Sequence, residues 1–186
     1  MSIDDDPMGM LQRIAAQTKQ PTPVAPVVDP QPVDVQDWTM PGFGPGARVE
    51  TSFGHVPIEA LRRRDPVRTK SGRFVKVQSV EAFKLDRRFL LNHPQAQPVT
   101  IPKNAFGAGC PDIDVLVSGA QTMMLPFRYD ERDGSSAESL IGQRNVLRKF
   151  TGYFTYYVID CGEPCTAHIS GLWANIMPYM PDISDE

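Results

Sequence analysis

The placement of proline is the feature that most constrains this chain. Eight of its eighteen prolines fall within the first 45 of 186 residues. Proline lacks a backbone N–H and restricts the residue before it, so a stretch with proline every few residues cannot form a long helix or a central strand. We therefore predict an extended N-terminal arm over 1–41, a body over 42–178 and an acidic tail over 179–186.

The arm combines a helical pattern with an extended apolar strip. Apolar residues recur at helical spacing over 6–19, with Asp6 as the expected N-cap and Pro7 as the first helical residue. So short a helix is marginal alone, so the segment is either frayed or docked on a partner. From Gln20 on, valines between prolines indicate an extended run, either a linker or a strip along a neighbour. The arm residues expected to contact a partner are Met8, Leu11, Ile14, Val24, Val27, Val28, Val33, Val35 and Trp38.

Charge and hydropathy exclude some classes of protein. The arm carries six Asp against Arg13 and Lys19, and the whole chain has a net charge of −3, which disfavours a general nucleic-acid binder. The sequence contains no window of about 18 apolar residues, so no membrane span is predicted, and the acidic start is not a secretory signal. We expect a cytoplasmic or particle-associated protein. The basic run Arg62, Arg63 and Arg64 is either a solvated loop or a docking patch for a partner, such as the acidic arm of a neighbouring copy.

The body shows short β-like runs separated by turn residues, which predicts an all-β domain with one or two short helices. Helical turns are expected over 57–62 and over 136–142, where Ser135 or Ser136 would be the cap. The dipeptide at 71–72, Ser-Gly, predicts a hairpin. The expected strands are 48–52, 55–58, 67–69, 74–83, 89–92, 99–101, 114–117, 122–125, 151–160 and 166–170.

Seven short blocks in this order resemble those of a Hint (hedgehog/intein) domain, in the bacterial subfamily, over residues 42–178. The blocks are PGARV at 45–49, VPIEAL at 56–61, RDPVRT at 64–69, VTIPKNAFG at 99–107, DVLVS with GAQTMML at 114–125, LIGQ at 140–143 and YFTYYV at 153–158. The resemblance implies a Hint-like fold of many short strands. It also implies an ancestral self-cleavage, in which a cysteine attacks the peptide carbonyl just before it and a histidine protonates the leaving nitrogen.

The resemblance also locates the residues that would do this chemistry. The cysteine position falls on Gly42, and the two histidine positions fall on Gln121 and Thr155. Glycine has no nucleophile, and glutamine and threonine cannot act as an acid–base pair near neutral pH. We therefore expect a non-catalytic, structural or binding subunit of a multi-subunit complex or phage-like particle, docking through its arm, with no cofactor. The alternative is a self-processing protein that uses non-standard residues, such as Thr39, and releases 1–41.

Three cysteines are too few for a disulfide scaffold and favour a reducing compartment. Cys161 and Cys165 flank a Gly-Glu-Pro turn that is expected to join strands 153–160 and 166–170 as a hairpin. They are structural thiols, a turn disulfide or part of a metal site completed by His168 and Cys110. We expect no metal. The other histidines, at positions 55 and 93, are expected to be solvated or structural.

Overall fold

The chain was analysed as a computed structural model, which describes residues 38–126 and 134–178. Within those ranges it consists mostly of short strands with one α-helix and a few 3-10 turns, which confirms the predicted all-β class. The predicted helix over 6–19, the other apolar arm residues from Met8 to Val35 and the tail over 179–186 lie outside the described residues. The division of the chain into arm, body and tail therefore stays a prediction.

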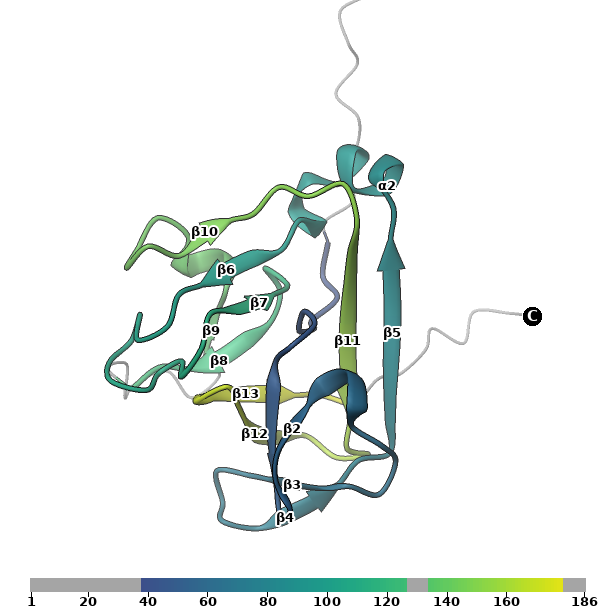
Figure 1. Cartoon of the computed structure of the whole chain (residues 1–186), viewed down its shortest axis with the longest axis vertical. Coiled ribbons are helices and arrows are strands. Elements are labelled where there is room, and N and C mark those ends of the chain that lie inside the picture. The colour runs from purple at the N-terminus through teal and green to yellow at the C-terminus, as the bar shows by residue number, and fades with distance from the viewer. Residues whose placement is uncertain (1–37, 127–133, 179–186) are drawn as a thin grey trace, which may run out of the picture. The chain divides into compact units, whose positions relative to one another are not determined.

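The largest sheet is antiparallel and has the strand order β4-β3-β1-β12-β13-β8-β9, with β2 paired along the whole of β1 (Figure 1). It brings the two ends of the body together, because β1 pairs with β3 and also with β12, the last strand but one. Its strands are β1 (Arg48–Thr51), β2 (Gly54–Pro57), β3 (Pro66–Arg68), β4 (Phe74–Lys76), β8 (Thr122–Met124), β9 (Ser135–Ser136), β12 (Cys165–Ile169) and β13 (Leu172–Ile176).

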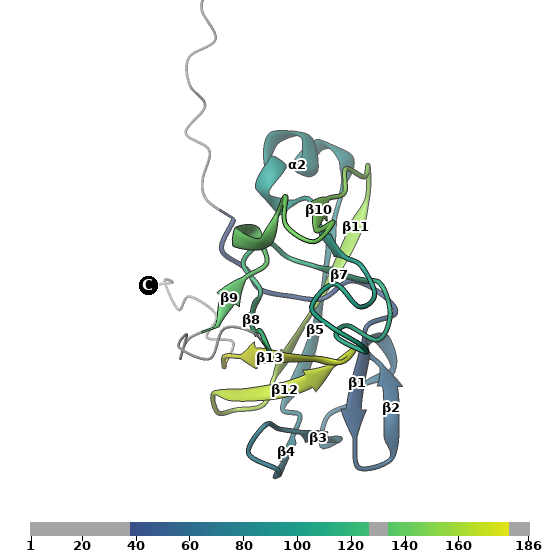
Figure 2. The ribbon, with the colours of Figure 1, turned by 90° about the vertical axis from the view of Figure 1, so that its left-hand side faces the viewer.

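Two further groups of strands meet at the segment before β1. One has the order β10-β6-β7, and the other is the long pair β5 and β11, which runs past the large sheet (Figures 1 and 2). Phe43 bridges them: its N–H donates to Tyr157 O (3.0 Å), Tyr157 N–H donates back (2.8 Å), and Gly44 N–H donates to Leu116 O (2.6 Å). These strands are β5 (Ser79–Leu85), β6 (Val99–Ile101), β7 (Val115–Val117), β10 (Leu147–Arg148) and β11 (Phe154–Asp160).

The core comprises two clusters of buried side chains. The larger includes Phe43, Val49, Ile101, Met123 and Ile169, which are all at most 1% exposed. This cluster joins the large sheet to β6 and β7, because it contains buried side chains from both. Each such side chain contributes roughly 1.5–3 kcal/mol to the free energy of folding by leaving water. The smaller cluster gathers around the ring of Tyr156, between β5, β11 and α2 (Arg87–Asn92).

The prediction of a strand over 89–92 is wrong, because these residues belong to α2. The carboxylate of Asp86 accepts a hydrogen bond from Phe89 N–H at 2.8 Å and so caps the helix. The Phe-Leu-Leu run at 89–91 is β-like in composition, but the cap three residues earlier decides the conformation. Only Leu90 of the helix is buried, which leaves Leu91 exposed.

The predicted strand over 74–83 is two strands, β4 and β5, which belong to different sheets. The chain changes sheet at Val77 and Gln78. Val77 N–H donates to Asp65 O (3.0 Å), whereas Gln78 N–H donates to Asp160 O (2.7 Å). The apolar alternation shifts phase at this crossing, because Gln78 and Ser79 are consecutive polar residues between Val77 and Val80.

The strand β13 was not predicted, although its turn carries a recognisable signal. Ser170 and Gly171 both have positive φ, 50° and 77°, which suits a two-residue hairpin turn between β12 and β13. The turn at 161–165, by contrast, joins β11 to β12 without a hairpin, because these strands pair with different partners.

Of the remaining local predictions, the hairpin is confirmed and the two helical segments are shorter than predicted. The Ser-Gly hairpin at 71–72 is confirmed by the pairing of β3 with β4. The helical segments predicted over 57–62 and 136–142 are only single 3-10 turns, at Ile58–Ala60 and Glu138–Leu140. Ser136 Oγ accepts from Ser139 N–H at 3.3 Å, close to the predicted cap.

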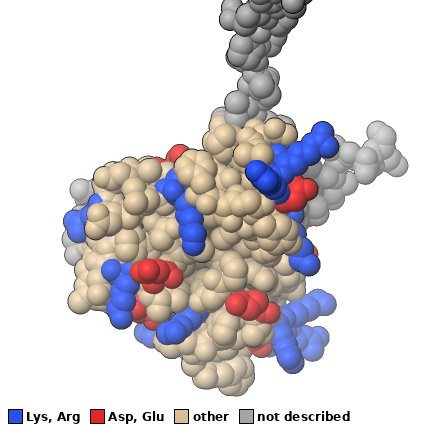
Figure 3. Space-filling view, turned by 45° about the horizontal axis from the view of Figure 1, so that its top comes forward, with Lys and Arg blue, Asp and Glu red and all other residues tan. Residues whose placement is uncertain are grey.

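No helix in the described ranges has the length and apolar character needed to cross a bilayer. On the face that Figure 3 shows, basic and acidic side chains are scattered among other residues rather than gathered by sign.

Candidate functional site

Gly42 and Gln121, two of the three positions singled out by the sequence, line one small pocket, here called the Gly42 pocket. Its other walls are Pro41, Phe43 and residues 157–159 and 175–177. The volume is about 10 Å³, close to the space of a single water molecule by this measure. Among the described residues that line it, none has a thiol, imidazole or carboxylate.

Gln121 is 1% exposed, and both of its amide hydrogens have partners. Its Nε2 donates to Thr122 O at 2.9 Å and to Asn175 O at 3.0 Å. The side chain thus joins the start of β8 to β13 and supplies donors to two main-chain carbonyls. The lone pair of an amide nitrogen is delocalised into its carbonyl, so this side chain neither accepts nor releases a proton near neutral pH.

Gly42 packs directly against β11. A Cβ added there would lie 3.3 Å from Tyr156 Cβ and Tyr157 O, and 3.4 Å from Val158 Cγ2. The carbonyl of Gly42 accepts from Ser118 N–H at 2.9 Å. A side chain at this position would fit only if these neighbours moved by a few tenths of an ångström.

Thr155 does not join the other two positions. It lies on β11 opposite Lys84, on the same face of the strand as Tyr157 but two residues before it. The part of β11 that lines the pocket begins at Tyr157, so Thr155 lies outside the lining. Thr39, the alternative nucleophile, is exposed and also lies outside the pocket lining. The structure therefore places two of the three family positions together.

The segment just before Gly42 is fixed to the body by Ser118, which is fully buried. Ser118 Oγ donates to Met40 O at 2.6 Å and accepts from Trp38 Nε1 at 2.9 Å. The Trp38 ring also packs on Phe89 and Tyr156, with centroid distances of 5.7 and 5.9 Å. Trp38, expected from the sequence to contact a partner, is thus engaged by its own chain.

The predicted docking patch Arg62, Arg63 and Arg64 lies exposed on the loop that leads into β3. Its backbone is well fixed: Arg62 N–H donates to Asp65 Oδ2 at 2.8 Å and Arg64 N–H donates to Val77 O at 2.7 Å. The patch is separate from the Gly42 pocket, with which it shares no lining residue.

A cluster that the sequence did not indicate lies on β1, β3 and β12. Glu50 Oε1 accepts from Arg68 Nη1 at 2.7 Å, and Glu50 Oε2 lies 2.5 Å from His168 Nδ1. That second contact is close but is not aligned as a hydrogen bond, and His168 Nδ1 is buried without one. The imidazole also packs on Trp173, its cross-strand neighbour, at 4.7 Å between ring centroids. We call Glu50, Arg68 and His168 the Glu50 cluster.

Both titrating side chains of the Glu50 cluster, His168 and Glu50, have lowered pKa values, for different reasons. Burial lowers the pKa of His168, assisted by Arg68 and His55 and opposed by Glu50 and Asp112. Burial raises the pKa of Glu50, but the Arg68 hydrogen bond and the nearby cations outweigh it, so the net pKa is lowered. His93, the third histidine, instead stacks on Phe89 at the end of α2, with ring centroids 4.2 Å apart.

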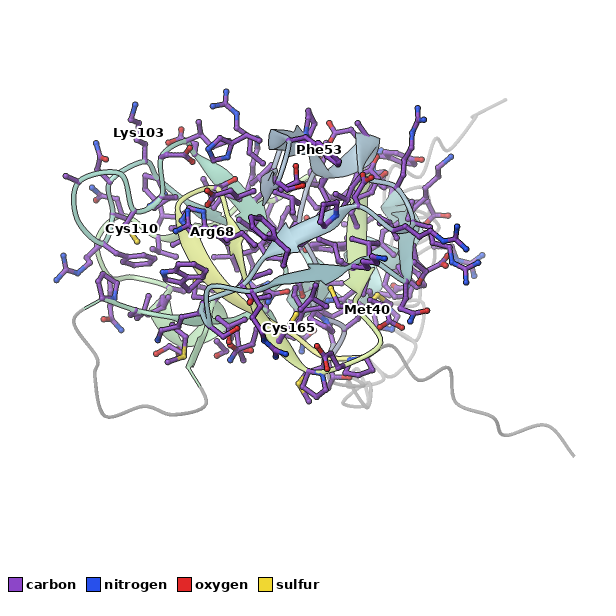
Figure 4. The ribbon with its side chains drawn as sticks, turned by 90° about the horizontal axis from the view of Figure 1, so that it is seen from below. Met40, Phe53, Arg68, Lys103, Cys110 and Cys165 are labelled. Carbon is purple, nitrogen blue, oxygen red and sulfur yellow. The ribbon has the colours of Figure 1, made fainter. Side chains whose placement is uncertain are left out.

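Cys161 and Cys165 flank the turn between β11 and β12, where Cys161 is buried and Cys165 is half-buried. All three cysteines are reduced, and Cys110 lies well away from Cys165 (Figure 4). Residues 38–126 and 134–178 contain no group of three or more side chains placed to hold a metal ion. The pair is therefore an isolated dithiol.

A family model described as the Hint domain matches residues 41–174. The crystal structure of the MchDnaB-1 intein is similar with a TM-score of 0.45 and 9% identity, covering 72% of this chain and 98% of the intein chain. No curated protein matches the chain.

Proposed function

The chain belongs to the Hint domain family, and on this premise we propose that it is a non-catalytic member that serves as a structural or binding subunit of a larger assembly. It keeps its N-terminal arm attached and docks through it on a protein partner or a neighbouring copy. The observation that carries the proposal is the Gly42 pocket, where the family's chemistry would take place.

Self-cleavage by this family's route needs a nucleophile beside the carbonyl of residue 41 and a group that protonates the leaving nitrogen. Position 42 offers only backbone, with β11 packed against it. Gln121 has both amide hydrogens committed to main-chain carbonyls. Among the described residues of the lining, Tyr157 is the one with an ionisable side chain, and it is a phenol rather than a nucleophilic thiol or an imidazole.

The anchoring of Trp38 and Met40 supports retention of the arm. In a self-cleaving relative, the residues before position 42 would belong to the segment that is released. Here Ser118 binds the Met40 carbonyl and the Trp38 indole, and the indole packs on two further rings. The segment before Gly42 thus forms part of the body, and an arm tied down in this way is suited to transmit a docking contact to the β domain.

The mass of the purified chain tests the absence of self-cleavage. After long incubation with a thiol and with hydroxylamine, the intact mass should remain 20.7 kDa. A fragment that starts at Gly42, or at Thr39 if the Thr39 hydroxyl attacks the carbonyl just before it, would overturn the proposal in favour of self-processing. The Thr39→Ala variant is the matched control, since a product that disappears with it would identify the hydroxyl as the nucleophile.

Deletion of residues 1–37 tests the role of the arm separately from the fold, because it leaves the Ser118 contacts in place. Sedimentation of the pure protein, and of the same tagged chain in extract of its own cells, should show a large complex for the full chain. The shortened chain should sediment as a folded monomer. If the two sediment alike, the arm does not dock.

A further inference from the structure

We propose that a second pocket, on the face of the large sheet opposite the core, binds a small, flat apolar molecule that carries one anionic group. The pocket lies between β8, β13, the turn before β13 and the loop over 108–110, and we call it the Trp173 pocket. Its volume is about 450 Å³, against about 10 Å³ for the Gly42 pocket, with which it shares no lining residue. The inference therefore does not depend on the proposed function.

One wall of the Trp173 pocket is a cross-strand pair of side chains. Trp173 on β13 lies directly opposite Met124 on β8, so both side chains project from the same face of the sheet. Their strand neighbours Ala174 and Met123 are buried in the larger core, so this face points away from that core. The Trp173 ring also packs on the imidazole of His168, at 4.7 Å between ring centroids, which fixes the indole as a wall.

A second wall is the loop over 108–110, which is held close to the turn before β13. Asp112 N–H donates to Ser170 O at 3.0 Å and so ties the end of the loop to that turn. The approach is possible only because residue 171 is glycine, since a Cβ there would collide with Gly109 O. Both walls are thus fixed by the fold itself, as is usual for small-molecule sites, which are largely preformed.

The lining favours a flat apolar ligand. Apart from one lysine, the described residues that line the pocket present an indole, a thioether, a thiol, aliphatic side chains and glycine backbone. An indole face and a thioether both make favourable contacts with aromatic rings. The volume of about 450 Å³ lies within the range of about 300–1,000 Å³ that is typical of small-molecule sites.

Lys70 supplies the only charge among the described lining residues. Its backbone is fixed, since Lys70 N–H donates to Thr166 O at 2.8 Å, and its side chain is exposed. Within residues 38–126 and 134–178, the Lys70 ammonium forms no ion pair. Lys70 also lines a neighbouring pocket that includes Arg73, so a second cation strengthens the positive potential at this end. A ligand with its apolar body beside Trp173 and its anionic group beside Lys70 matches both features of the pocket.

Three naphthalene probes that differ in the charge of one substituent test the ligand class: 2-naphthoate, 2-naphthamide and 2-naphthylmethylammonium. NMR of the full chain follows the indole N–H signal of Trp173, and that of Trp38 is the internal control because Trp38 packs on Phe89 and Tyr156 instead. We expect naphthoate to shift the Trp173 signal and to bind most tightly, followed by the amide and then the ammonium. Absence of a shift with naphthoate, or an affinity for the amide or the ammonium that equals or exceeds it, would overturn the proposal.

Lys70→Gln tests the partner of the anionic group. Its matched control is Lys76→Gln, because Lys76 is an exposed lysine of β4 that lies outside the pocket lining. The Kd of naphthoate should rise about three- to fivefold in Lys70→Gln, which is the effect of losing one solvent-exposed ion pair. The Kd of naphthamide should stay the same in both variants. Equal losses of naphthoate affinity in Lys70→Gln and Lys76→Gln would mean that overall charge, and not Lys70, attracts the anion.

The location of the ligand is tested by filling the pocket and by alkylating Cys110. Ala108 is an exposed lining residue, so Ala108→Trp fills the pocket without altering the core, and Ala60→Trp, exposed but outside the lining, is the control. Naphthoate binding should be lost in the first variant only. In the parent chain, naphthoate should slow the alkylation of Cys110 by iodoacetamide but not that of Cys165, which lies outside the lining. Alkylation of Cys110 at an unchanged rate would place the probe elsewhere and overturn the proposal.

Discussion

The Gly42 pocket and the Glu50 cluster are opposites in chemistry. The pocket lies where the family's reaction would occur, but its polar groups are neutral and Gln121 has both donors satisfied. The Glu50 cluster lies on β1, β3 and β12, where it combines a carboxylate, a guanidinium and an imidazole with lowered pKa values at Glu50 and His168. A fold can therefore keep the position of a reaction site after the residues that would carry out the reaction have been replaced. In this chain, Glu50 and His168 titrate in a different part of the fold from the Gly42 pocket.

The two regions should also differ in what they contribute to stability. Gly42 and Gln121 are both buried, so a methyl group added at Gly42, or the loss of the hydrogen bonds of Gln121, lowers the stability without compensation by solvent. The Glu50 cluster is partly exposed, with Arg68 at 49% and Glu50 at 20%, so solvent screens its ion pairs. Substitutions in the two regions test this difference.

The largest effect is expected for alanine at Gly44, two residues from the pocket's centre. A Cβ there would lie 2.7 Å from Phe154 Cζ and 2.8 Å from Leu116 Cβ, whereas at Gly42 the closest contact would be 3.3 Å. We expect Gly44→Ala to lower the free energy of unfolding by about 3 kcal/mol, and Gly42→Ala by about 1 kcal/mol. Urea denaturation measures both. Equal losses would mean that position 42 has no more room for a side chain than position 44.

The second effect concerns Gln121. Replacing it with leucine keeps a similar volume but leaves Thr122 O and Asn175 O without its donors, which should cost about 2–3 kcal/mol. Gln143 is the matched control, because it is exposed and its Nε2 donates to the main-chain carbonyl of Ser139. Gln143→Leu should change the stability by less than about 0.5 kcal/mol. If both variants unfold at the same urea concentration, Gln121 has no structural role.

The sequence predicted the fold class because its signals are local. Short β-like runs, the turn at 71–72 and the ordered blocks of the family each depend on neighbouring residues. The same reasoning missed α2, where the Asp86 cap outweighs a β-like run. It also missed the change of sheet at Val77 and Gln78, where the only local sign is a shift in the phase of the apolar alternation.

The same distinction between local and long-range signals applies to the Gly42 pocket and the Glu50 cluster. Gly42 and Gln121 were found through the family's block order, and the structure places them in one pocket. The Glu50 cluster could not be found, because its members lie at positions 50, 68 and 168 and meet only through the pairing of β1 with β3 and β12. Long-range strand pairing is not encoded in any local pattern. A histidine in a short strand gives no sign of its charged neighbours.

The third effect tests the link between the pocket and the arm. Ser118→Ala removes the hydrogen bonds to Met40 O and Trp38 Nε1, so the free energy of unfolding should fall by about 1–2 kcal/mol. Limited proteolysis should then cut before Gly42 faster than in the parent chain. Ser139, an exposed serine that donates to Ser136 O, supplies the control variant Ser139→Ala. Unchanged proteolysis in Ser118→Ala would mean that this serine does not hold the segment.

The smallest effect is the pH dependence of the Glu50 cluster. The pKa of His168 is lowered in the folded state, so the unfolded chain binds the proton first as pH falls. The free energy of unfolding should therefore decrease between about pH 7 and pH 5, and the lowered pKa of Glu50 should extend this loss below about pH 4.5. His168→Gln should flatten the upper part of the curve.

Glu50→Gln separates the cluster's two charges, because Glu50 is the larger of the two influences that raise the His168 pKa. Without it, the folded-state pKa of His168 falls further from its unfolded value, so the stability should decline more steeply between about pH 7 and pH 5 than in the parent chain. Each change should stay below about 1 kcal/mol because the groups are partly solvated. Urea denaturation at a series of pH values measures both variants. If the free energy of unfolding depended less steeply on pH in both Glu50→Gln and His168→Gln than in the parent chain, Glu50 would not support the charged form of His168. The Glu50 cluster would then contain titrating groups that do not act on one another, and its contrast with the neutral Gly42 pocket would lie only in which residues are present.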